Sequence, residues 1–210
     1  MIRSRRQIVS LAAIVFTASL VAACGSSPTT SFYTLATVPA DTTMPARQPP
    51  AVIAVGPVRL PDYIDRPQFV TRSSSYSISL AAFDQWAGPL DDMLPRALAD
   101  DLTQRLPGDR VVSFPQVSGP NFDYRIAVNI NQFDVDSTGT ATLAAQWQIY
   151  DVNSPRALIV EEDTFRRQAT GSSYEAYTAA LSFVLADLSD RLRDNLGAVR
   201  GAAPRPITVQ

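Results

Sequence analysis

Acidic segments are the first places in this sequence where side chains could do chemistry. Asp134, Asp136 and Thr138 alternate along the chain and a glycine follows, which is the spacing of the first half of a calcium-binding loop. The position at which such a loop needs a bidentate glutamate holds Ala145, and the flanking residues alternate like strands rather than helices. The segment is therefore predicted to be the turn of a β-hairpin.

The other reactive groups lack the partners that catalysis needs. Glu161, Glu162 and Asp163 are consecutive, so in a strand they point to opposite faces and cannot form an opposed acid–base pair. The serines at 73–75 have no base to activate a hydroxyl, because the chain contains neither histidine nor lysine. Serine–histidine and cysteine–histidine catalysis and histidine-ligated metals are excluded for the same reason. We expect no enzymatic activity and no metal; a hydrolase built on carboxylates alone is the remaining enzyme hypothesis.

The charge balance argues against nucleic-acid binding. The 210 residues carry 18 arginines and 20 acidic side chains, a formal charge of −2. Residues 1–23 hold three of the arginines and no acid, so the rest of the chain has 15 arginines against 20 acids. Binding to a phosphate backbone needs clustered basic residues, and no nucleic-acid partner is expected.

Cys24 is the sole thiol and follows a segment with the layout of a secretory signal. Three arginines precede sixteen uncharged residues, 8–23, which is short for a membrane span. The segment ends in Val-Ala-Ala-Cys-Gly, a lipobox, the pattern at which bacterial enzymes diacylate a cysteine and cleave before it. A transmembrane anchor is the alternative, but the only cysteine falls at the cleavage position. We expect residues 1–23 to be a signal peptide and Cys24 to carry a diacylglycerol and an acyl chain, with no other cofactor.

The residues after Cys24 indicate which membrane holds the chain. Several acyl chains on one residue give near-permanent attachment. The pattern resembles lipoproteins of bacteria with two membranes, in which an aspartate after the cysteine favours retention at the inner membrane. Gly25 and Ser26 stand there instead. The resemblance implies the periplasmic face of the outer membrane, with residues 24–30 as a lipidated tether.

The chain after the tether is predicted to form one α/β domain, residues 31–197, with a mixed β-sheet packed by two main helices. Alternating apolar residues and turn signals predict strands at 31–37, 51–60, 69–72, 75–80, 110–114, 124–135, 140–152 and 157–168.

The two helices are expected at about 90–106 and 173–196. Pro95 either marks a late start of the first helix or kinks it. Ser172 and Glu175 form a capping-box pattern before the second helix, and Gly197 is placed as the residue after its end. Residues 198–210 contain two prolines and are predicted to be a disordered tail.

Two segments carry polar and aromatic residues in a pattern that catalysis does not explain. Residues 56–68 hold three prolines, two arginines and two aspartates, so their side chains are held on a stiff connection. A tryptophan and a proline then precede the first helix. In a structural interpretation, Asp65 pairs with Arg66 or Arg59, and Trp86 covers the end of the sheet. In a functional one, the segments dock another protein, and arginine, tyrosine and tryptophan are the usual anchors. The candidate partner-binding residues are Arg59, Pro61, Tyr63, Asp65, Arg66, Pro67, Trp86, Pro89 and Leu90.

These segments carry a family resemblance. The runs GPVRLPDYIDRPQFVTR and FDQWAGPLDDMLPRAL, after a lipobox and a short FYTL strand, are similar to the ABC-type transport auxiliary lipoproteins, the PqiC-like family, over roughly residues 31–196. The resemblance implies an α/β fold and a non-enzymatic outer-membrane lipoprotein. It implies that the protein takes part in lipid transport between membranes. Its partners would be a mammalian-cell-entry (MCE) domain protein, which spans the periplasm, and transport components in the inner membrane. It also implies that copies can associate into rings. The alternative is a lipoprotein that carries an acyl chain in its own cavity.

Overall fold

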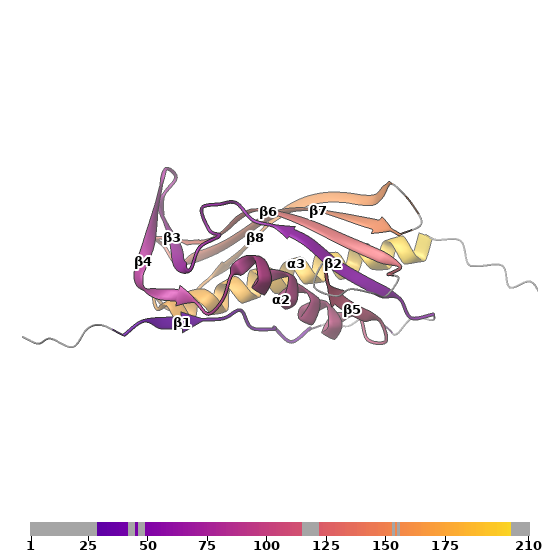
Figure 1. Cartoon of the computed structure of the whole chain (residues 1–210), viewed down its shortest axis with the longest axis horizontal. Coiled ribbons are helices and arrows are strands. Elements are labelled where there is room, and N and C mark those ends of the chain that lie inside the picture. The colour runs from indigo at the N-terminus through magenta and orange to yellow at the C-terminus, as the bar shows by residue number, and fades with distance from the viewer. Residues whose placement is uncertain are drawn as a thin grey trace, which may run out of the picture. The chain divides into compact units, whose positions relative to one another are not determined.

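A mixed sheet of eight strands, within the described residues, forms the framework of the domain (Figure 1). Its strands are β1 (Ser31–Tyr33), β2 (Val52–Arg59), β3 (Gln68–Ser74), β4 (Ser77–Trp86), β5 (Arg110–Ser113), β6 (Tyr124–Asp136), β7 (Thr140–Asp151) and β8 (Ala157–Gln168). The helices are α2 (Leu90–Arg105) and α3 (Tyr174–Ala202). The predicted class, a mixed sheet packed by two main helices, is confirmed.

This computed structural model describes residues 29–41, 45, 49–114, 122–152, 154 and 156–202. The predicted signal peptide, Cys24 and most of the tether lie outside the described residues, as does the chain beyond residue 202. Within the described part, no helix has both the length and the apolar character needed to cross a membrane.

Strand β6 organises the sheet because its two edges have different partners. One edge pairs with β7 in antiparallel fashion along nearly its whole length, and β8 continues the sheet beyond β7. The other edge is shared: its first half pairs with β2, ending at Arg59 opposite Asn129, and its end pairs with β3, where Thr71 lies opposite Val135. An interval of β6 between these pairings is therefore left to the connection between β2 and β3.

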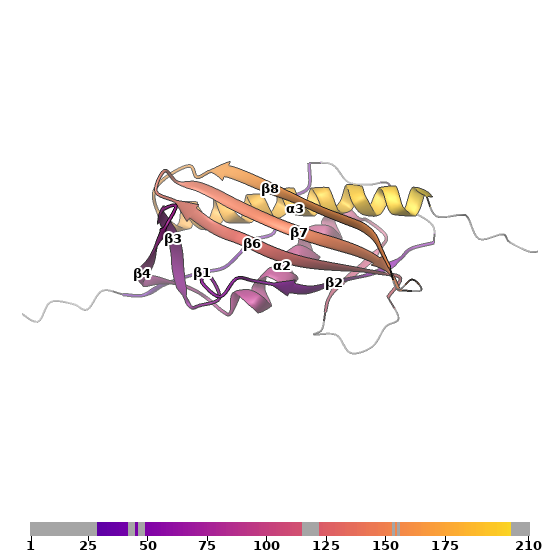
Figure 2. The same ribbon diagram turned by 90° about the horizontal axis from the view of Figure 1, so that it is seen from above.

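Both helices lie on the same face of the sheet (Figure 2). Helix α2 packs against β2 and β5, and α3 packs against β7 and β8. The core between them is built from aliphatic stripes at helical spacing and from inward-facing strand residues. Its fully buried members include Leu94, Leu98 and Leu102 of α2, Leu181, Leu185, Leu188, Leu192 and Leu196 of α3, and Ile53, Ile126, Leu143 and Trp147 of the sheet.

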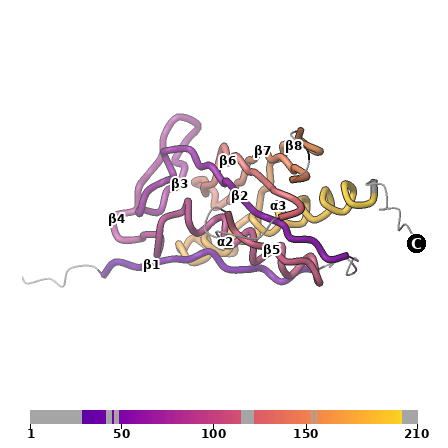
Figure 3. Tube along the Cα trace, turned by 45° about the vertical axis from the view of Figure 1, so that its right-hand side comes forward, coloured from indigo at the N-terminus to yellow at the C-terminus, as the bar shows by residue number. Residues whose placement is uncertain are grey.

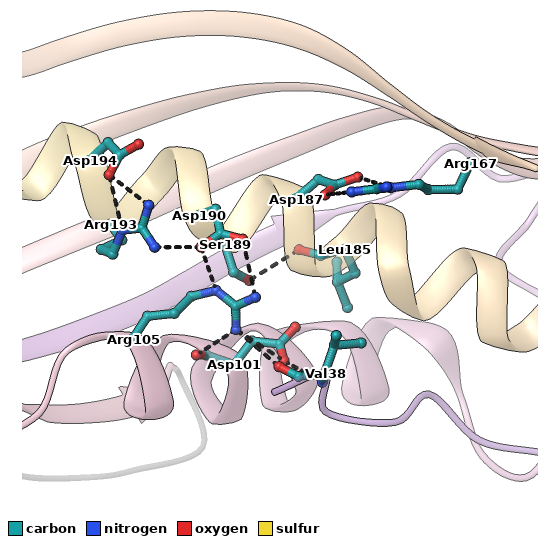
Figure 4. Close-up of polar contacts among 10 residues, drawn as sticks. All are labelled: Val38, Asp101, Arg105, Arg167, Leu185, Asp187, Ser189, Asp190, Arg193 and Asp194. Carbon is teal, nitrogen blue, oxygen red and sulfur yellow. Dashed lines mark hydrogen bonds and ion pairs between the residues drawn. The ribbon is translucent and has the colours of Figure 1, made fainter. Parts of the chain in front are cut away.

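A buried ion cluster joins the two helices (Figure 4). The guanidinium of Arg105, only 1% exposed, donates from Nε to the carboxylate of Asp190 on α3 at 3.0 Å. Its Nη1 donates to the carbonyls of Val38 and Asp101 at 3.2 and 3.1 Å. The Asp101 carboxylate accepts the backbone N–H of Val38 at 3.0 Å, and burial raises its pKa to about 6. The cluster therefore fixes the chain after β1 against both helices.

The first strand is shorter than predicted, because residues beyond Tyr33 bond to helices rather than to a strand. The backbone N–H of Ala36 donates to the Ser182 hydroxyl of α3 at 3.2 Å, and Val38 bonds to α2 as described. This stretch runs beside α2 in both Figure 1 and Figure 3. Strand β4, in turn, continues six residues beyond its predicted end, because β1 pairs with its last three residues in parallel.

Helix α2 begins at Leu90, five residues before Pro95, so a late start at Pro95 is wrong. Helix α3 continues to Ala202, and the prediction that residues 198–202 belong to a disordered tail is wrong. The physical reason lies in tertiary contacts, because Arg200 pairs with Asp109 and donates to the carbonyl of Pro49 at 3.3 Å. At its start, the Ser173 hydroxyl accepts the N–H of Ala176 at 3.2 Å, one residue later than the predicted cap.

The hairpin predicted after β6 is confirmed. The carboxylate of Asp136 accepts the backbone N–H groups of Thr138 and Thr140 at 2.8 and 3.0 Å. Gly139 closes the turn at a φ of +82°, a conformation that favours glycine. The acidic side chains here serve the turn and, as shown below, the neighbouring loop.

Candidate functional site

The two candidate segments of the sequence meet at one shallow pocket. The backbone N–H of Trp86 donates to the carbonyl of Pro67 at 2.8 Å, which ties the end of β4 to the β2–β3 loop. A cavity of about 260 Å³ opens at this junction, lined by Asp65, Arg66, Pro67, Trp86, Gly88 and Pro89. Segments that lie about twenty residues apart in the sequence thus share one surface.

Local bonds give the β2–β3 loop its shape. Two prolines, Pro61 and Pro67, restrict its backbone, and the N–H of Ile64 donates to the carbonyl of Pro61 at 3.1 Å. The N–H of Arg66 donates to the carbonyl of Ile64 at 2.8 Å. The Ile64 side chain is only 1% exposed, so it anchors the loop in the core. Asp65 and Arg66 follow this anchor directly and are held toward the pocket.

A buried carboxylate holds the same loop to the sheet. Asp134, on the interval of β6 between its pairings with β2 and β3, is fully buried. It accepts the Tyr63 hydroxyl at 2.9 Å and the Gln132 amide at 2.8 Å. The guanidinium of Arg72 on β3 pairs with it at 2.6 Å and donates to the Tyr63 hydroxyl at 3.3 Å. Tyr63 therefore positions the loop from inside and is not a free surface anchor.

The environment of this cluster raises the pKa values of Tyr63 and Arg72 and so favours their protonated forms. Burial raises the pKa of Tyr63 to about 12, and its hydrogen bond to the Asp134 carboxylate acts in the same direction. The bond to Asp134 raises the pKa of Arg72. Because Asp134 receives three different donor groups, the buried charge is compensated as a network. The loop is thereby held at a defined place beside the pocket.

Trp86 and Leu90 belong mainly to the core. Trp86 is 5% exposed and stacks on Phe69 with ring centroids 4.8 Å apart, while Tyr33 meets Phe69 edge-on at 6.1 Å. Leu90 is 1% exposed at the first turn of α2. Trp86 thus closes this end of the sheet, as the structural interpretation predicted, and one part of it also lines the pocket. A partner-binding role for either residue stays a prediction.

Asp65 and Arg66, the two charged residues at the pocket, have polar groups without a hydrogen-bond partner in the described structure. The predicted pairing of Asp65 with Arg66 or Arg59 is wrong: no described residue binds the Asp65 carboxylate. The Nε of Arg66 is buried without a hydrogen-bond partner in the described structure, and its Nη2 reaches only the Asp62 carbonyl at 3.4 Å. An unsatisfied buried donor costs free energy, so a carbonyl or carboxylate placed beside it would bind favourably.

The structure therefore divides the candidate residues into two groups. Asp65, Arg66, Pro67, Trp86 and Pro89 line the pocket. The others stand outside its lining: Arg59 ends β2, Pro61 forms the loop turn, Tyr63 bonds Asp134, and Leu90 fills the core.

Sequence reasoning missed Gly88 in the lining and the supporting pair of Asp134 and Arg72. One signal was available for the pair. Asp134 stands between the apolar residues Phe133 and Val135 in a strand, and a charge buried there requires a cationic partner.

The lining of the pocket offers groups that can bind a partner. Its lining combines rigid proline and tryptophan surfaces with one cation and one anion, and it holds no acid–base pair in an opposed arrangement. Within the described residues, no group of three or more acidic or thiol side chains is placed to hold a metal ion.

Comparison with known proteins agrees with this fold. Residues 33–192 match the protein family described as the ABC-type transport auxiliary lipoprotein component. The intermembrane transport lipoprotein PqiC of Escherichia coli K12 is 27% identical over 144 residues, covering 68% of this chain and 73% of that protein; its Shigella flexneri counterpart matches equally. A crystal structure of a Xanthomonas campestris protein superposes with a TM-score of 0.66 at 18% identity, covering 82% of this chain and 99% of that one. A second crystal structure, of an uncharacterised protein, gives 0.66 at 21% identity, covering 80% and 99%.

Proposed function

The chain belongs to the family of ABC-type transport auxiliary lipoprotein components, and on this premise we propose that it is a non-enzymatic adaptor whose pocket docks a protein partner. The observation that carries the proposal is the pocket itself. Both candidate segments build it, a buried network holds its loop, and Asp65 and the Nε of Arg66 have no described partner there. Stiff, preorganised surfaces bind at a low cost in conformational entropy.

The chemistry of the pocket defines the segment it would accept. Arg66 requires a carbonyl or carboxylate oxygen, Asp65 favours a donor or a cation, and the faces of Pro67 and Pro89 favour an apolar side chain between them. A loop that carries one apolar residue flanked by polar groups of both kinds fits this description. The cavity is smaller than the roughly 300–1,000 Å³ of most small-molecule sites, which favours a protein side chain over an enclosed acyl chain.

The partner in this proposal is an MCE-domain protein that spans the periplasm, together with inner-membrane transport components. The support is the family and the printed name of the E. coli relative, an intermembrane transport lipoprotein. Cys24, with its diacylglycerol and acyl chain, holds the domain at the periplasmic face of the outer membrane. The pocket then receives the outer end of the partner, and copies of the chain assemble around it as a ring.

The test is photo-crosslinking in intact cells with a photo-reactive residue at position 65, which leaves Arg66 in place. Mass spectrometry of the products is expected to identify an MCE-domain protein. A probe at Arg166, an exposed position on β8, is the control and should not capture it. Lipid adducts alone at position 65 would favour the acyl-carrier alternative. Capture of the partner from position 166 and not from 65 would refute the pocket as the docking site.

A charge reversal measures the role of Arg66 directly. Arg66→Glu is expected to lower partner recovery in a pull-down, because a carboxylate replaces the guanidinium that meets the partner's oxygen. Arg166→Glu makes the same charge change at an exposed residue away from the pocket and should leave recovery unchanged. Equal recovery for both variants, with unfolding curves like that of the wild type, would remove Arg66 from the interface.

A further inference from the structure

One end of the domain carries a cluster of exposed apolar side chains. Eight large hydrophobic residues are exposed in the described structure. Four of them lie in β1, in the turn between β3 and β4, and in β4. Phe32 is 64% exposed, Tyr76 is fully exposed at the hairpin tip, and Leu80 and Phe83 are each 46% exposed. Exposed apolar groups gathered at one place mark interaction surfaces rather than ordinary surface variation.

Strand register shows that Phe32 and Phe83 share a face. In the parallel pair of β1 and β4, Phe32 lies opposite Gln85, while Tyr33 lies opposite Trp86. Tyr33 and Trp86 both pack toward Phe69 in the core, so the alternate residues face outward. Phe83 directly precedes Asp84, whose carboxylate accepts the hydroxyl of the inward-facing Tyr33. Phe83 therefore points to the same outer side as Phe32.

The surface has no charged side chain in either of its segments. Residues 73–83, which include the whole hairpin turn, contain only serine, tyrosine, isoleucine, leucine, alanine and phenylalanine. No charged residue occurs between Cys24 and Ala40. Asp84 is the charged group beside Phe83, and it lies on the inner side of the strand, where its carboxylate accepts the Tyr33 hydroxyl at 2.8 Å. An uncharged surface of serine and aromatic groups is suited to the lipid–water interface.

The position of Cys24 in the sequence identifies the occupant. Seven peptide units separate Cys24 from Ser31, and an extended chain of that length spans at most about 25 Å. β1 begins at Ser31, and β1 and the β3–β4 hairpin lie at the same end of the domain (Figure 1). A lipid-anchored chain with so short a tether must hold this end near the bilayer.

We propose that the outer face of β1–β4, formed by Phe32 and Phe83, and the Tyr76 hairpin tip rest in the interface of the membrane that holds Cys24. The proposal rests on the lipid anchor of the proposed function but not on the docking pocket. It assigns the domain a fixed orientation on the bilayer, in which the membrane contacts the aromatic face and the remaining surface is open to protein partners.

The test is tryptophan fluorescence in the acylated full-length protein. Phe32→Trp, Tyr76→Trp and Phe83→Trp place reporters on the face, and Val160→Trp, at a 56% exposed site on β8, is the matched control. The native Trp86 and Trp147 are buried and give a constant background that the wild type measures. Each protein is reconstituted into vesicles of phosphatidylethanolamine and phosphatidylglycerol, with and without lipids that carry a nitroxide on the acyl chain.

Nitroxide lipids are expected to reduce the emission at positions 32, 76 and 83 and to leave that at position 160 unchanged. Reporters at 32, 76 and 83 that lose no more emission than the one at 160 overturn the proposal. A shift of the reporter emission to the blue without quenching also overturns the proposal, because it would mean that a second copy of the chain covers the face. Acylation of Cys24 is verified by mass beforehand, and crosslinking at position 65 is scored separately, so failure of the anchor or of the pocket is distinguishable from failure of this face.

Discussion

Asp134 shows how one side chain can determine the geometry of a site it does not line. Its carboxylate is fully buried, yet it is compensated by Arg72, Tyr63 and Gln132. One of these donors, Tyr63, belongs to the pocket loop and another, Arg72, to the strand that follows it, so the aspartate holds both the loop and β3 to β6. Buried networks of this kind favour a single arrangement because each incomplete alternative leaves a polar group unsatisfied.

Removal of the Tyr63 hydroxyl tests this positioning role. Tyr63→Phe deletes one hydrogen bond to Asp134 while keeping the ring, and it should lower the free energy of unfolding by about 1 kcal/mol. Urea denaturation measures the change. Tyr76→Phe removes a hydroxyl from a fully exposed ring and is expected to have no effect. Equal midpoints for Tyr63→Phe and the wild type would contradict the role assigned to this bond.

Asp101 predicts a dependence of stability on pH. Burial raises its pKa from 3.8 to about 6, so between about pH 4 and pH 6 the folded protein binds a proton that the unfolded chain releases. The contribution of Asp101 therefore makes the free energy of unfolding fall as the pH rises through this window, and the loss is complete above about pH 6. The full contribution of Asp101 to the free energy of unfolding, present below about pH 4, is about 3 kcal/mol.

Urea unfolding at pH 4, 5, 6 and 7 checks this prediction. Asp101→Asn removes the titrating group and should flatten the curve in that window relative to the wild type. Asp91→Asn alters an exposed residue ten positions earlier on the same helix and should leave the slope as it is. A slope in Asp101→Asn that equals that of the wild type would assign the pH dependence to other groups.

At the scale of elements, α3 extends beyond its sequence signals because of what it contacts. Gly197 marks a favourable end in the sequence, but Arg200 lies one turn later and pairs with Asp109. Asp109 also accepts the N–H of Ala51 at 2.9 Å, at the start of β2. The last turn of α3 is thus tied to the β2–β5 side of the sheet through this pair.

Arg200→Ala is expected to destabilise the protein by about 3 kcal/mol, because Asp109 is left buried without its cation. Amide hydrogen exchange should also speed up in residues 197–202, where the helix would fray. The matched change is Arg191→Ala, which removes a half-exposed pair with Asp163 and should cost less than about 1 kcal/mol. Similar decreases in the free energy of unfolding for the two variants would mean that the buried Arg200–Asp109 pair stabilises the protein no more than an exposed pair does.

At the scale of the whole molecule, the sheet and its helices serve to place two surfaces. The pocket forms where the β2–β3 loop meets the turn before α2, and the aromatic face forms where β1 pairs with β4. Both depend on β6, since β2 and β3 pair with successive parts of one of its edges. The family match covers residues 33–192, which includes both the pocket and most of the aromatic face.

The lipid anchor gives the prediction at this scale. Replacing residues 1–24 with a secretory signal peptide that is cleaved without acylation should move the protein from the membrane fraction to the soluble periplasmic fraction, because the acyl chains on Cys24 supply the attachment. Fractionation with immunodetection measures the shift, and the mass of the wild-type chain should show acylation at Cys24. A wild-type chain whose mass shows that residues 1–23 are retained and that Cys24 carries no acyl chain would support the transmembrane alternative for residues 8–23.

Much of the fold follows from local patterns that are readable in the sequence. Alternation over β6, β7 and β8 and the leucine stripe of α3 appear where they were expected, because the periods of strands and helices are properties of neighbouring residues. The proline-rich loop and the turn before α2 were also identified as special. Their composition alone predicted stiffness and candidate anchors.

The assignment of each anchor needed the tertiary structure. The sequence left Trp86 either as a docking anchor or as a cover for the end of the sheet, and its pairing with β1 turns it onto Phe69 in the core. Asp65 reads as half of an ion pair, but it stands without a described partner.

The sequence by itself contains the lipobox pattern, lacks histidine and lysine, and predicts the order of the elements. The pocket, the Asp134 network and the aromatic face are decided by which strands pair, because Asp134 and Tyr63 are 71 residues apart in the chain and meet only through the order of the sheet.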